Sequence, residues 1–158
     1  MKISTKGEES MKKVKTHGPQ ETQDIALKLS KKILLKKPKK SAVVLALQGD
    51  LGAGKTTFVQ GFALGLGIQE KVLSPTFILM RRFDIDSFIF KNFYHIDCYR
   101  LENEKDLEVL GFKEILNNPE NIIAIEWPEK ISNILPQKVI EIKFKHLIEN
   151  KRTLTINE

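Results

Sequence analysis

A glycine-rich turn between two apolar segments constrains the fold of this chain more than any other feature. The stretch GDLGAGKT, Gly49 to Thr56, fits the phosphate-binding pattern G-x-x-x-x-G-K-[S/T]. Where this pattern is used, a strand runs into the turn and a helix leaves it, so that backbone N–H groups and the helix N-terminus meet a phosphate. The pattern therefore predicts an α/β unit here, provided that the flanking residues agree.

The flanking residues do agree. The preceding stretch SAVVLAL, Ser41 to Leu47, is short and β-branched, which is typical of a strand buried on both faces. Large apolar residues then recur on one face from Lys55 to Leu66, which predicts a helix, and Gly67 is suited to cap it. Because Gly61 and Gly65 lower the helix propensity, we expect close packing of this helix against a neighbour.

The remaining segments complete a small α/β domain. The predicted elements are an amphipathic helix over Glu21 to Leu35, a hairpin of Thr76 to Phe83 with Phe88 to Ile96, one or two short helices over Asp106 to Leu116 with a break near Gly111, a buried strand over Ile122 to Glu126, and a C-terminal hairpin of Lys138 to Phe144 with Arg152 to Ile156. We therefore predict one P-loop NTPase domain over residues 20–158, with a small mixed parallel and antiparallel sheet flanked by helices. Residues 1–19 are predicted to be an N-terminal extension that could contain a first strand.

Composition restricts the class of protein. With 158 residues, 41% of them hydrophobic, the chain suits a single domain. The first residues contain no apolar run typical of a signal peptide, and no later stretch approaches the ~20 apolar residues of a membrane span. One cysteine, Cys98, and three scattered histidines offer neither a disulfide nor zinc-ligand spacing. We therefore expect a cytoplasmic protein with no membrane contact.

The net charge of +6 would suit an RNA or an acidic protein as a partner. Only four of the 26 basic residues are arginine, the residue that favours base readout and bidentate phosphate contacts. For the lysine-rich run from Lys36 to Lys40, we favour a solvated loop over a nucleic-acid patch. The basic charge thus permits RNA contact without requiring it.

Each residue of the phosphate-binding stretch has an expected role. Asp50 to Gly54 supply backbone N–H groups that cradle phosphates, and Lys55 reaches the outer phosphates. Thr56 offers its hydroxyl to Mg²⁺, and Thr57 lies near the α-phosphate. Without nucleotide, we expect the Lys55 side chain to be exposed to solvent. A glycine-rich turn that binds nothing is the alternative interpretation.

Two carboxylates are candidates for the magnesium site. Mg²⁺ prefers octahedral oxygen coordination, so a protein carboxylate should face Thr56. Glu126 ends the apolar run IIAI, and Asp97 ends FYHI. Ligands of open α/β sheets bind at the carboxyl ends of the strands, which is where both residues are expected. Either residue could orient an attacking water, and either could instead cap a helix or a turn.

Three further features lie near these motifs. The SPT stretch, Ser74 to Thr76, offers two hydroxyls that could become ordered on ATP binding, as in switch segments, and an ordinary proline turn is the alternative. Trp127 follows Glu126 and is expected to lie against the nucleotide, against a partner or in the core. Arg100 could stabilise charge in phosphoryl transfer or form a common salt bridge.

Five motifs occur in order along the chain. They are GDLGAGKTTF (Gly49 to Phe58), SPTF (Ser74 to Phe77), YHIDCYRLE (Tyr94 to Glu102), LGFKEIL (Leu110 to Leu116) and IEWPEKI (Ile125 to Ile131). Together they resemble the motifs of the TsaE (YjeE) family, the small bacterial P-loop ATPases of tRNA threonylcarbamoyladenosine synthesis. Residues 1–10 match nothing in this pattern, and Met11 is an alternative start of the chain.

The resemblance implies a protein that binds ATP and Mg²⁺, hydrolyses ATP weakly by itself and acts with the TsaD and TsaB proteins. Those partners form threonylcarbamoyladenosine at position 37 of tRNAs that read codons beginning with adenine. The resemblance thus implies indirect contact with tRNA through the complex, and direct contact stays open. The implied nucleotide contacts are Gly49, Asp50, Leu51, Gly52, Ala53, Gly54, Lys55, Thr56, Thr57 and Thr76, the implied magnesium ligands are Thr56 and Glu126, and the implied catalytic residues are Lys55, Asp97 and Glu126.

Two other functions stay open on the sequence. A small-molecule kinase shares the phosphate-binding loop but normally adds a lid with several arginines, and this chain has only four. A nucleotide-sensing regulatory subunit would change its partner affinity with only incidental hydrolysis. A GTPase is disfavoured because NKRT at Asn150 lacks the aspartate of the guanine-reading element N-K-x-D. Since no arginine stands out as a finger, we expect slow hydrolysis that a partner accelerates.

Overall fold

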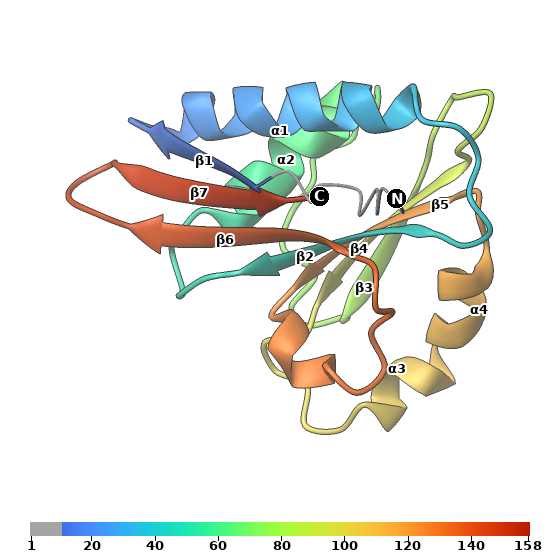
Figure 1. Cartoon of the computed structure of the whole chain (residues 1–158). Coiled ribbons are helices and arrows are strands. Elements are labelled where there is room, and N and C mark those ends of the chain that lie inside the picture. The colour runs from blue at the N-terminus through green and yellow to red at the C-terminus, as the bar shows by residue number, and fades with distance from the viewer. Residues whose placement is uncertain (1–10) are drawn as a thin grey trace, which may run out of the picture.

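A seven-stranded mixed sheet runs through the centre of the structure (Figure 1). The computed structural model describes residues 11–158. The strands lie in the order β1-β7-β6-β2-β5-β4-β3. Their bounds are β1 (Met11–Thr16), β2 (Val43–Gln48), β3 (Met80–Asp84), β4 (Asn92–Asp97), β5 (Asn121–Glu126), β6 (Ile140–His146) and β7 (Arg152–Asn157).

The four strands in the middle of the sheet are parallel. β2 pairs with β6 on one side and with β5 on the other, and β4 pairs with β5. Both margins are antiparallel, because β7 and β1 follow β6, and β3 lies beside β4. Parallel strands end at the same edge of a sheet, so the segments that follow β2, β4, β5 and β6 meet at one edge.

Helices cover both faces of the sheet, but to different extents (Figure 1). α1 and α2 pack together over one face, where Phe58 and Phe62 join Leu45 in the larger hydrophobic cluster. The shorter helices cover the other face, where Leu107 and Phe112 join Ile123 in a second cluster. The helices are α1 (Pro19–Leu34), α2 (Lys55–Gly65), α3 (Lys105–Val109), α4 (Phe112–Asn117) and the 3₁₀ helix η1 (Pro128–Ile131).

This architecture confirms the predicted α/β class with a mixed sheet. β2 is buried on both faces, since Leu45 and Leu47 belong to the first cluster and Val44 to the second. The two short helices α3 and α4 are separated by Gly111, which has φ 81°. No helix within residues 11–158 combines the length and the apolarity that a crossing of the bilayer needs.

Both strands of the predicted hairpin begin later than expected. The strand expected from Phe88 begins only at Asn92, as β4. The strand expected from Thr76 is a turn at its start, and β3 begins only at Met80. The reason is polar: the hydroxyls of Ser74 and Thr76 each donate to Asp97 Oδ2 at 2.8 Å, which holds the segment against the end of β4. Leu79 then adopts φ 63° before the strand starts.

The predicted N-terminal extension, residues 1–19, lies partly outside the described residues. Its described part contains β1, which pairs antiparallel with β7 from Met11 to Thr16 and forms one edge of the sheet. α1 begins at Pro19, beside the expected domain boundary. The division of the chain at that boundary stays a prediction.

α1 and α2 approach each other so closely that two glycines of α2 have no room for a side chain. A Cβ added at Gly61 would overlap the backbone of Gln23, and one added at Gly65 would overlap the Ser30 hydroxyl and the Leu27 carbonyl. These contacts confirm the close packing that the two glycines led us to expect.

We expect Gly61→Ala to lower the free energy of unfolding by about 1–3 kcal/mol, because the added methyl group forces α1 and α2 apart. Urea unfolding followed by circular dichroism measures this change. Leu64→Ala in the same helix is the control, since Leu64 is 57% exposed, and its effect should stay within about 0.5 kcal/mol. Equal effects of the two variants would contradict the packing argument.

The thiol of Cys98 should be inert in the folded protein. Cys98 is fully buried, and burial, assisted by the Asp97 carboxylate, raises the pKa of its thiol to about 12. Near pH 8 we therefore expect no reaction of the native protein with Ellman's reagent, and complete reaction once urea unfolds the chain. A native thiol that reacted as fast as the unfolded one would show that Cys98 is accessible.

Candidate functional site

The glycine-rich loop links the end of β2 to the start of α2, as the sequence predicts. Gly52 and Gly54 have φ 77° and 105°, a left-handed backbone that side chains rarely tolerate, and Gly54 is the N-cap of α2. A Cβ at Gly49 would lie 2.9 Å from Cβ of Phe144. The loop therefore needs glycine at these three positions, at two for their dihedral angles and at the third for space.

Lys55 is buried, which corrects the expectation that it is exposed without nucleotide. Its side chain is folded back over the loop, where Nζ donates to the carbonyl oxygen of Asp50 at 2.9 Å and to that of Gly49. Nζ also lies 4.2 Å from the centre of the Trp127 ring. Burial lowers the pKa of the ammonium, while carboxylates, first among them that of Glu126, act in the opposite direction.

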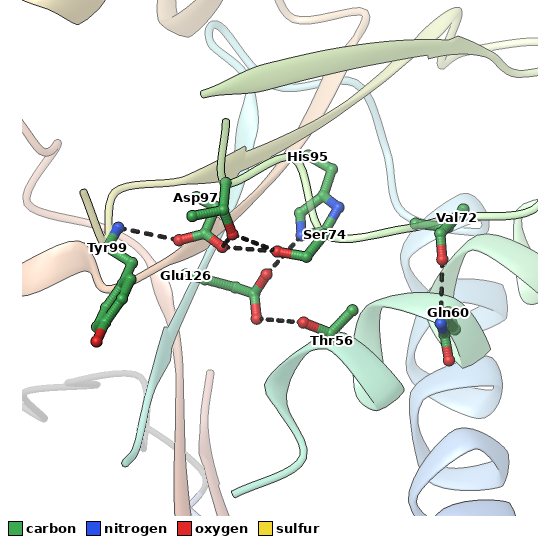
Figure 2. Close-up of polar contacts among 9 residues, drawn as sticks. Thr56, Gln60, Val72, Ser74, His95, Asp97, Tyr99 and Glu126 are labelled. Carbon is green, nitrogen blue, oxygen red and sulfur yellow. Dashed lines mark hydrogen bonds and ion pairs between the residues drawn. The ribbon is translucent and has the colours of Figure 1, made fainter. Parts of the chain in front are cut away.

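A line of three polar side chains connects α2, β5 and β4 (Figure 2). The Thr56 hydroxyl donates to Glu126 Oε1 at 2.9 Å, and His95 Nε2 lies 2.8 Å from Glu126 Oε2. Glu126 and His95 are 2% and 0% exposed. His95 Nδ1 is buried without a partner within the described residues, which favours the tautomer in which Nε2 carries the proton and donates to the carboxylate.

The oxygens of Thr56 and Glu126 fit a magnesium ion. Both are hard ligands, and their hydrogen bond shows that they converge on one point at the N-terminus of α2. Within residues 11–158 no three His, Cys, Asp or Glu side chains gather into a site of their own for a metal. Mg²⁺ commonly takes one or two protein oxygens and completes its shell with phosphate and water, which suits this pair.

Asp97 lies beside Glu126, because β4 and β5 pair in a register that sets these two residues opposite each other. Its carboxylate accepts hydrogen bonds from the hydroxyls of Ser74 and Thr76 through Oδ2, and from the Tyr99 N–H through Oδ1 at 2.9 Å (Figure 2). Asp97 therefore ties the SPT stretch to the end of β4.

The loop that carries the SPT stretch, residues 72–79, is held at three places. Gln60 of α2 donates to the carbonyl oxygen of Val72 at 3.0 Å (Figure 2), and the Leu79 carbonyl accepts from the Asp97 N–H at 2.9 Å. Between these ends, Asp97 holds the two hydroxyls. We call residues 72–79 the SPT loop.

These groups surround a cavity of about 310 Å³. It is lined by Leu51, Gly52, Gly54, Lys55, Thr56, Thr57, Ser74, Thr76, Asp97, Tyr99, Glu126 and Trp127. The structure thus brings together most of the predicted site residues. Gly49, Asp50 and Ala53 do not line the cavity: the first two bind Lys55 through their carbonyls, and Ala53 is 2% exposed in the core.

Besides Tyr99, which lines the cavity and donates its N–H to Asp97, two neighbours of the site were not identified from the sequence. One is His95, which shares a face of β4 with Asp97 because the two are separated by one residue. The other is Arg152 at the start of β7, whose Nη2 donates to the Gly52 carbonyl at 3.3 Å. Arg152 also lines a small cleft of about 80 Å³ on the other side of the loop, together with Gly18, Pro19, Thr22, Gly52, Gly54, Thr57 and Asn150.

Trp127 lines the cavity, whereas Arg100 lies outside it. Trp127, at φ 59°, lies at the rim of the cavity with its ring 5.1 Å from that of Tyr99. Arg100 forms no ion pair with residues 11–158, and its guanidinium lies 4.5 Å from the ring of Phe77, which is 83% exposed. Arg100 is therefore placed against the SPT loop and does not line the cavity.

A strand, a glycine-rich loop and a helix with this lysine and this Thr–Glu pair define a nucleotide-binding P-loop protein of the α/β class. The family model described as threonylcarbamoyl adenosine biosynthesis protein TsaE matches residues 16–154. The chain belongs to this family.

Individual relatives agree with the family match. The chain is 40% identical to the tRNA threonylcarbamoyladenosine biosynthesis protein TsaE of Bacillus subtilis over 143 residues, which are 90% of this chain and 83% of the relative. It is 40% identical to the protein of that name from Haemophilus influenzae over 114 residues, 72% of this chain and 70% of the relative. The crystal structure of Bacillus subtilis YdiB superposes with a TM-score of 0.73 at 34% identity, covering 94% of this chain and 86% of that one. The predicted family, fold class and role in threonylcarbamoyladenosine biosynthesis are confirmed.

We expect His95→Leu to destabilise the protein by about 1–3 kcal/mol, because it leaves Glu126 Oε2 buried without a donor. His95→Gln keeps an N–H donor of similar reach and should recover part of the loss. Urea unfolding of both variants measures the difference. If His95→Gln were as unstable as His95→Leu, the hydrogen bond to Glu126 would not be the source of the stability.

Proposed function

We propose that the protein is a Mg²⁺-dependent ATPase with a low basal rate that its partners raise. The observation that carries the proposal is the pair Thr56–Glu126, which lies at the N-terminus of α2 next to Lys55. A hydroxyl and a carboxylate at this position are the groups that hold the magnesium ion of a bound nucleoside triphosphate.

The phosphates would enter the cavity over the glycine-rich loop. Lys55 then leaves the carbonyl oxygens of Gly49 and Asp50 and binds the outer phosphates, which offer the buried ammonium full negative charge. Thr57 lines both the main cavity and the small cleft beside Arg152. With the α-phosphate at Thr57, the nucleoside would lie on the side of the loop that carries Arg152.

Thr56 and Glu126 would hold the magnesium ion, which supplies charge neutralisation on the β- and γ-phosphate oxygens. His95 keeps the Glu126 carboxylate turned toward Thr56 by bonding its second oxygen. Asp97 holds Ser74 and Thr76 at the outer end of the cavity, where the γ-phosphate and the attacking water would lie. In this arrangement Asp97 and Glu126 both serve hydrolysis, one at the SPT loop and one at the metal.

A low basal rate follows from the lining of the cavity. None of its lining residues is an arginine, so the cavity offers no guanidinium for the charge that develops in phosphoryl transfer. We propose that the TsaD and TsaB proteins of the same biosynthesis complete or order the site. In that scheme the ATPase supports turnover of the complex that modifies adenosine in tRNA, and it performs no transfer itself.

One observation favours a nucleotide-sensing role as a second candidate. The SPT loop touches the cavity through Ser74 and Thr76, while Phe77 and Ile78 in the same loop are 83% and 63% exposed. A γ-phosphate that competes with Asp97 for the two hydroxyls would therefore move apolar surface that a partner protein can bind.

Magnesium-dependent ATP hydrolysis, measured with and without TsaD and TsaB, tests the proposal. We expect Lys55→Ala and Glu126→Gln each to lower the rate by about 10²-fold or more, because each removes a group that binds the phosphates or their metal. Lys37→Ala and Glu102→Gln are matched controls at exposed positions and should leave the rate unchanged.

Because Lys55 is buried, the unfolding free energy of each variant must be measured beside its rate. Full hydrolysis by folded Lys55→Ala would disprove the ATPase proposal. If the partners left the rate unchanged while ATP altered the affinity for them, the nucleotide-sensing role would replace it.

A further inference from the structure

Part of the sheet is left without a helical cover. The second hydrophobic cluster, under α3, α4 and η1, draws its strand residues from β2, β4 and β5. The apolar residues of β6 and β7, such as Ile142, Phe144 and Leu154, all belong to the other cluster, on the side of α1 and α2. The opposite face of β6, β7 and β1 therefore meets solvent, and Figure 1 shows α3 and α4 well away from these strands.

The residues on this open face form a regular pattern of lysines and threonines. The register sets Lys13, Thr155 and Lys143 side by side across β1, β7 and β6, and it sets Lys15, Thr153 and Lys145 in the neighbouring row. Four lysines thus lie on β1 and β6, and two threonines lie between them on β7. We call these six residues the lysine face.

The lysine face is concave. Its residues line a hollow of about 370 Å³, which also contains one exposed apolar side chain, Leu147, at the end of β6. Thr153 is only 6% exposed at the bottom, whereas the lysines are exposed around it. With strands ~4.8 Å apart and alternate residues ~6.8 Å apart along a strand, the four lysines enclose the hollow at spacings of roughly 7–10 Å.

The positive charge of this face is weakly compensated. Lys143 lies 3.5 Å from Glu141, at the end of the face, and this pair is well exposed to solvent. Lys13, Lys15 and Lys145 form no ion pair with residues 11–158. Exposed like charges at such spacings repel one another, so a bound polyanion would lower the electrostatic energy of the face.

Prevention of edge-to-edge pairing explains the lysines of β1 but not those of β6. Lysines on an edge strand prevent pairing with another chain, and Lys13 and Lys15 lie on the edge strand β1. Lys143 and Lys145 lie on β6, which is paired on both sides, by β2 and by β7. An interior strand needs no such protection, so the lysines of β6 call for another reason.

We propose that the lysine face binds the sugar-phosphate backbone of RNA. Ammonium groups and hydroxyls are typical phosphate contacts, and the spacing of the lysines is comparable with that of phosphates along a strand. The centres of protein–protein interfaces are typically enriched in apolar and aromatic side chains and depleted in lysine, which is the opposite of this face. The face carries no arginine and no exposed aromatic ring, so it would bind the backbone without reading bases.

This inference rests on the role of the family in tRNA modification and is independent of the hydrolysis proposed above. It places the subunit in direct contact with RNA, whereas the resemblance of the motifs implies contact through partner proteins and leaves direct contact open. The location supports it, because β7 leads from Arg152, at the glycine-rich loop, directly to Thr153 in the hollow.

Filter binding of a radiolabelled tRNA transcript, measured without nucleotide over a range of salt concentrations, tests the inference. The variant Lys15→Glu/Lys145→Glu reverses two charges that face each other across Thr153. The matched control Lys37→Glu/Lys39→Glu makes the same change of net charge in the exposed loop before β2. Basal ATP hydrolysis and urea unfolding establish that both variants are folded.

We expect the first variant to bind the transcript about tenfold or more weakly, with a salt slope smaller by about 2, and the control to bind within about twofold of the unchanged protein. A tRNA that reads other codons should bind equally well, because the face has no base-reading groups. Equal losses in both variants would mean that net charge alone attracts RNA and would overturn the site. Unchanged RNA binding by the first variant, with lost affinity for TsaD and TsaB, would assign the face to an acidic protein and also overturn it.

Discussion

The site depends on the two hydrogen bonds that the buried carboxylate of Glu126 accepts. A carboxylate removed from water must be hydrogen-bonded on both oxygens, and here the donors come from α2 and from β4. One side chain on β5 therefore fixes the start of the helix and the end of a neighbouring strand relative to each other. The parallel pairing of β2, β5 and β4 makes this possible, because it brings three strand ends to one edge.

The strand ends that support the site are packed more firmly than the SPT loop. β2 and β5 are buried on both faces, so their ends are rigid supports for the glycine-rich loop and for Glu126. The SPT loop is packed at its two ends, since Val72 belongs to the larger hydrophobic cluster and Leu79 packs against the second one. Between these ends, Asp97 holds the hydroxyls of Ser74 and Thr76, and Phe77 and Ile78 lie in solvent. Segments with few buried apolar contacts open at low cost, so we expect this middle part of the loop to move more easily than the strand ends.

The sequence was sufficient for those features that local patterns encode. The glycine-rich loop, the buried strand before it and the strand-end positions of Asp97 and Glu126 follow from spacing and periodicity. The register of β4 with β5 does not, because pairing depends on the packing of the whole sheet. For that reason the contact of His95 with Glu126 and that of Arg152 with Gly52 emerged only in three dimensions. The buried position of Lys55 escaped sequence analysis too, since the carbonyls that hold it belong to the folded loop.

Because the Lys55 ammonium lies over the Trp127 ring, the fluorescence of Trp127 should report the position of this lysine. The emission of an indole depends on charge close to its ring, and this chain has one tryptophan. If a nucleotide phosphate binds Lys55 as proposed, the ammonium leaves the indole and the tryptophan emission is expected to change. Stopped-flow fluorescence on the unlabelled protein would then time the binding and release of the nucleotide, with no dye and no added residue.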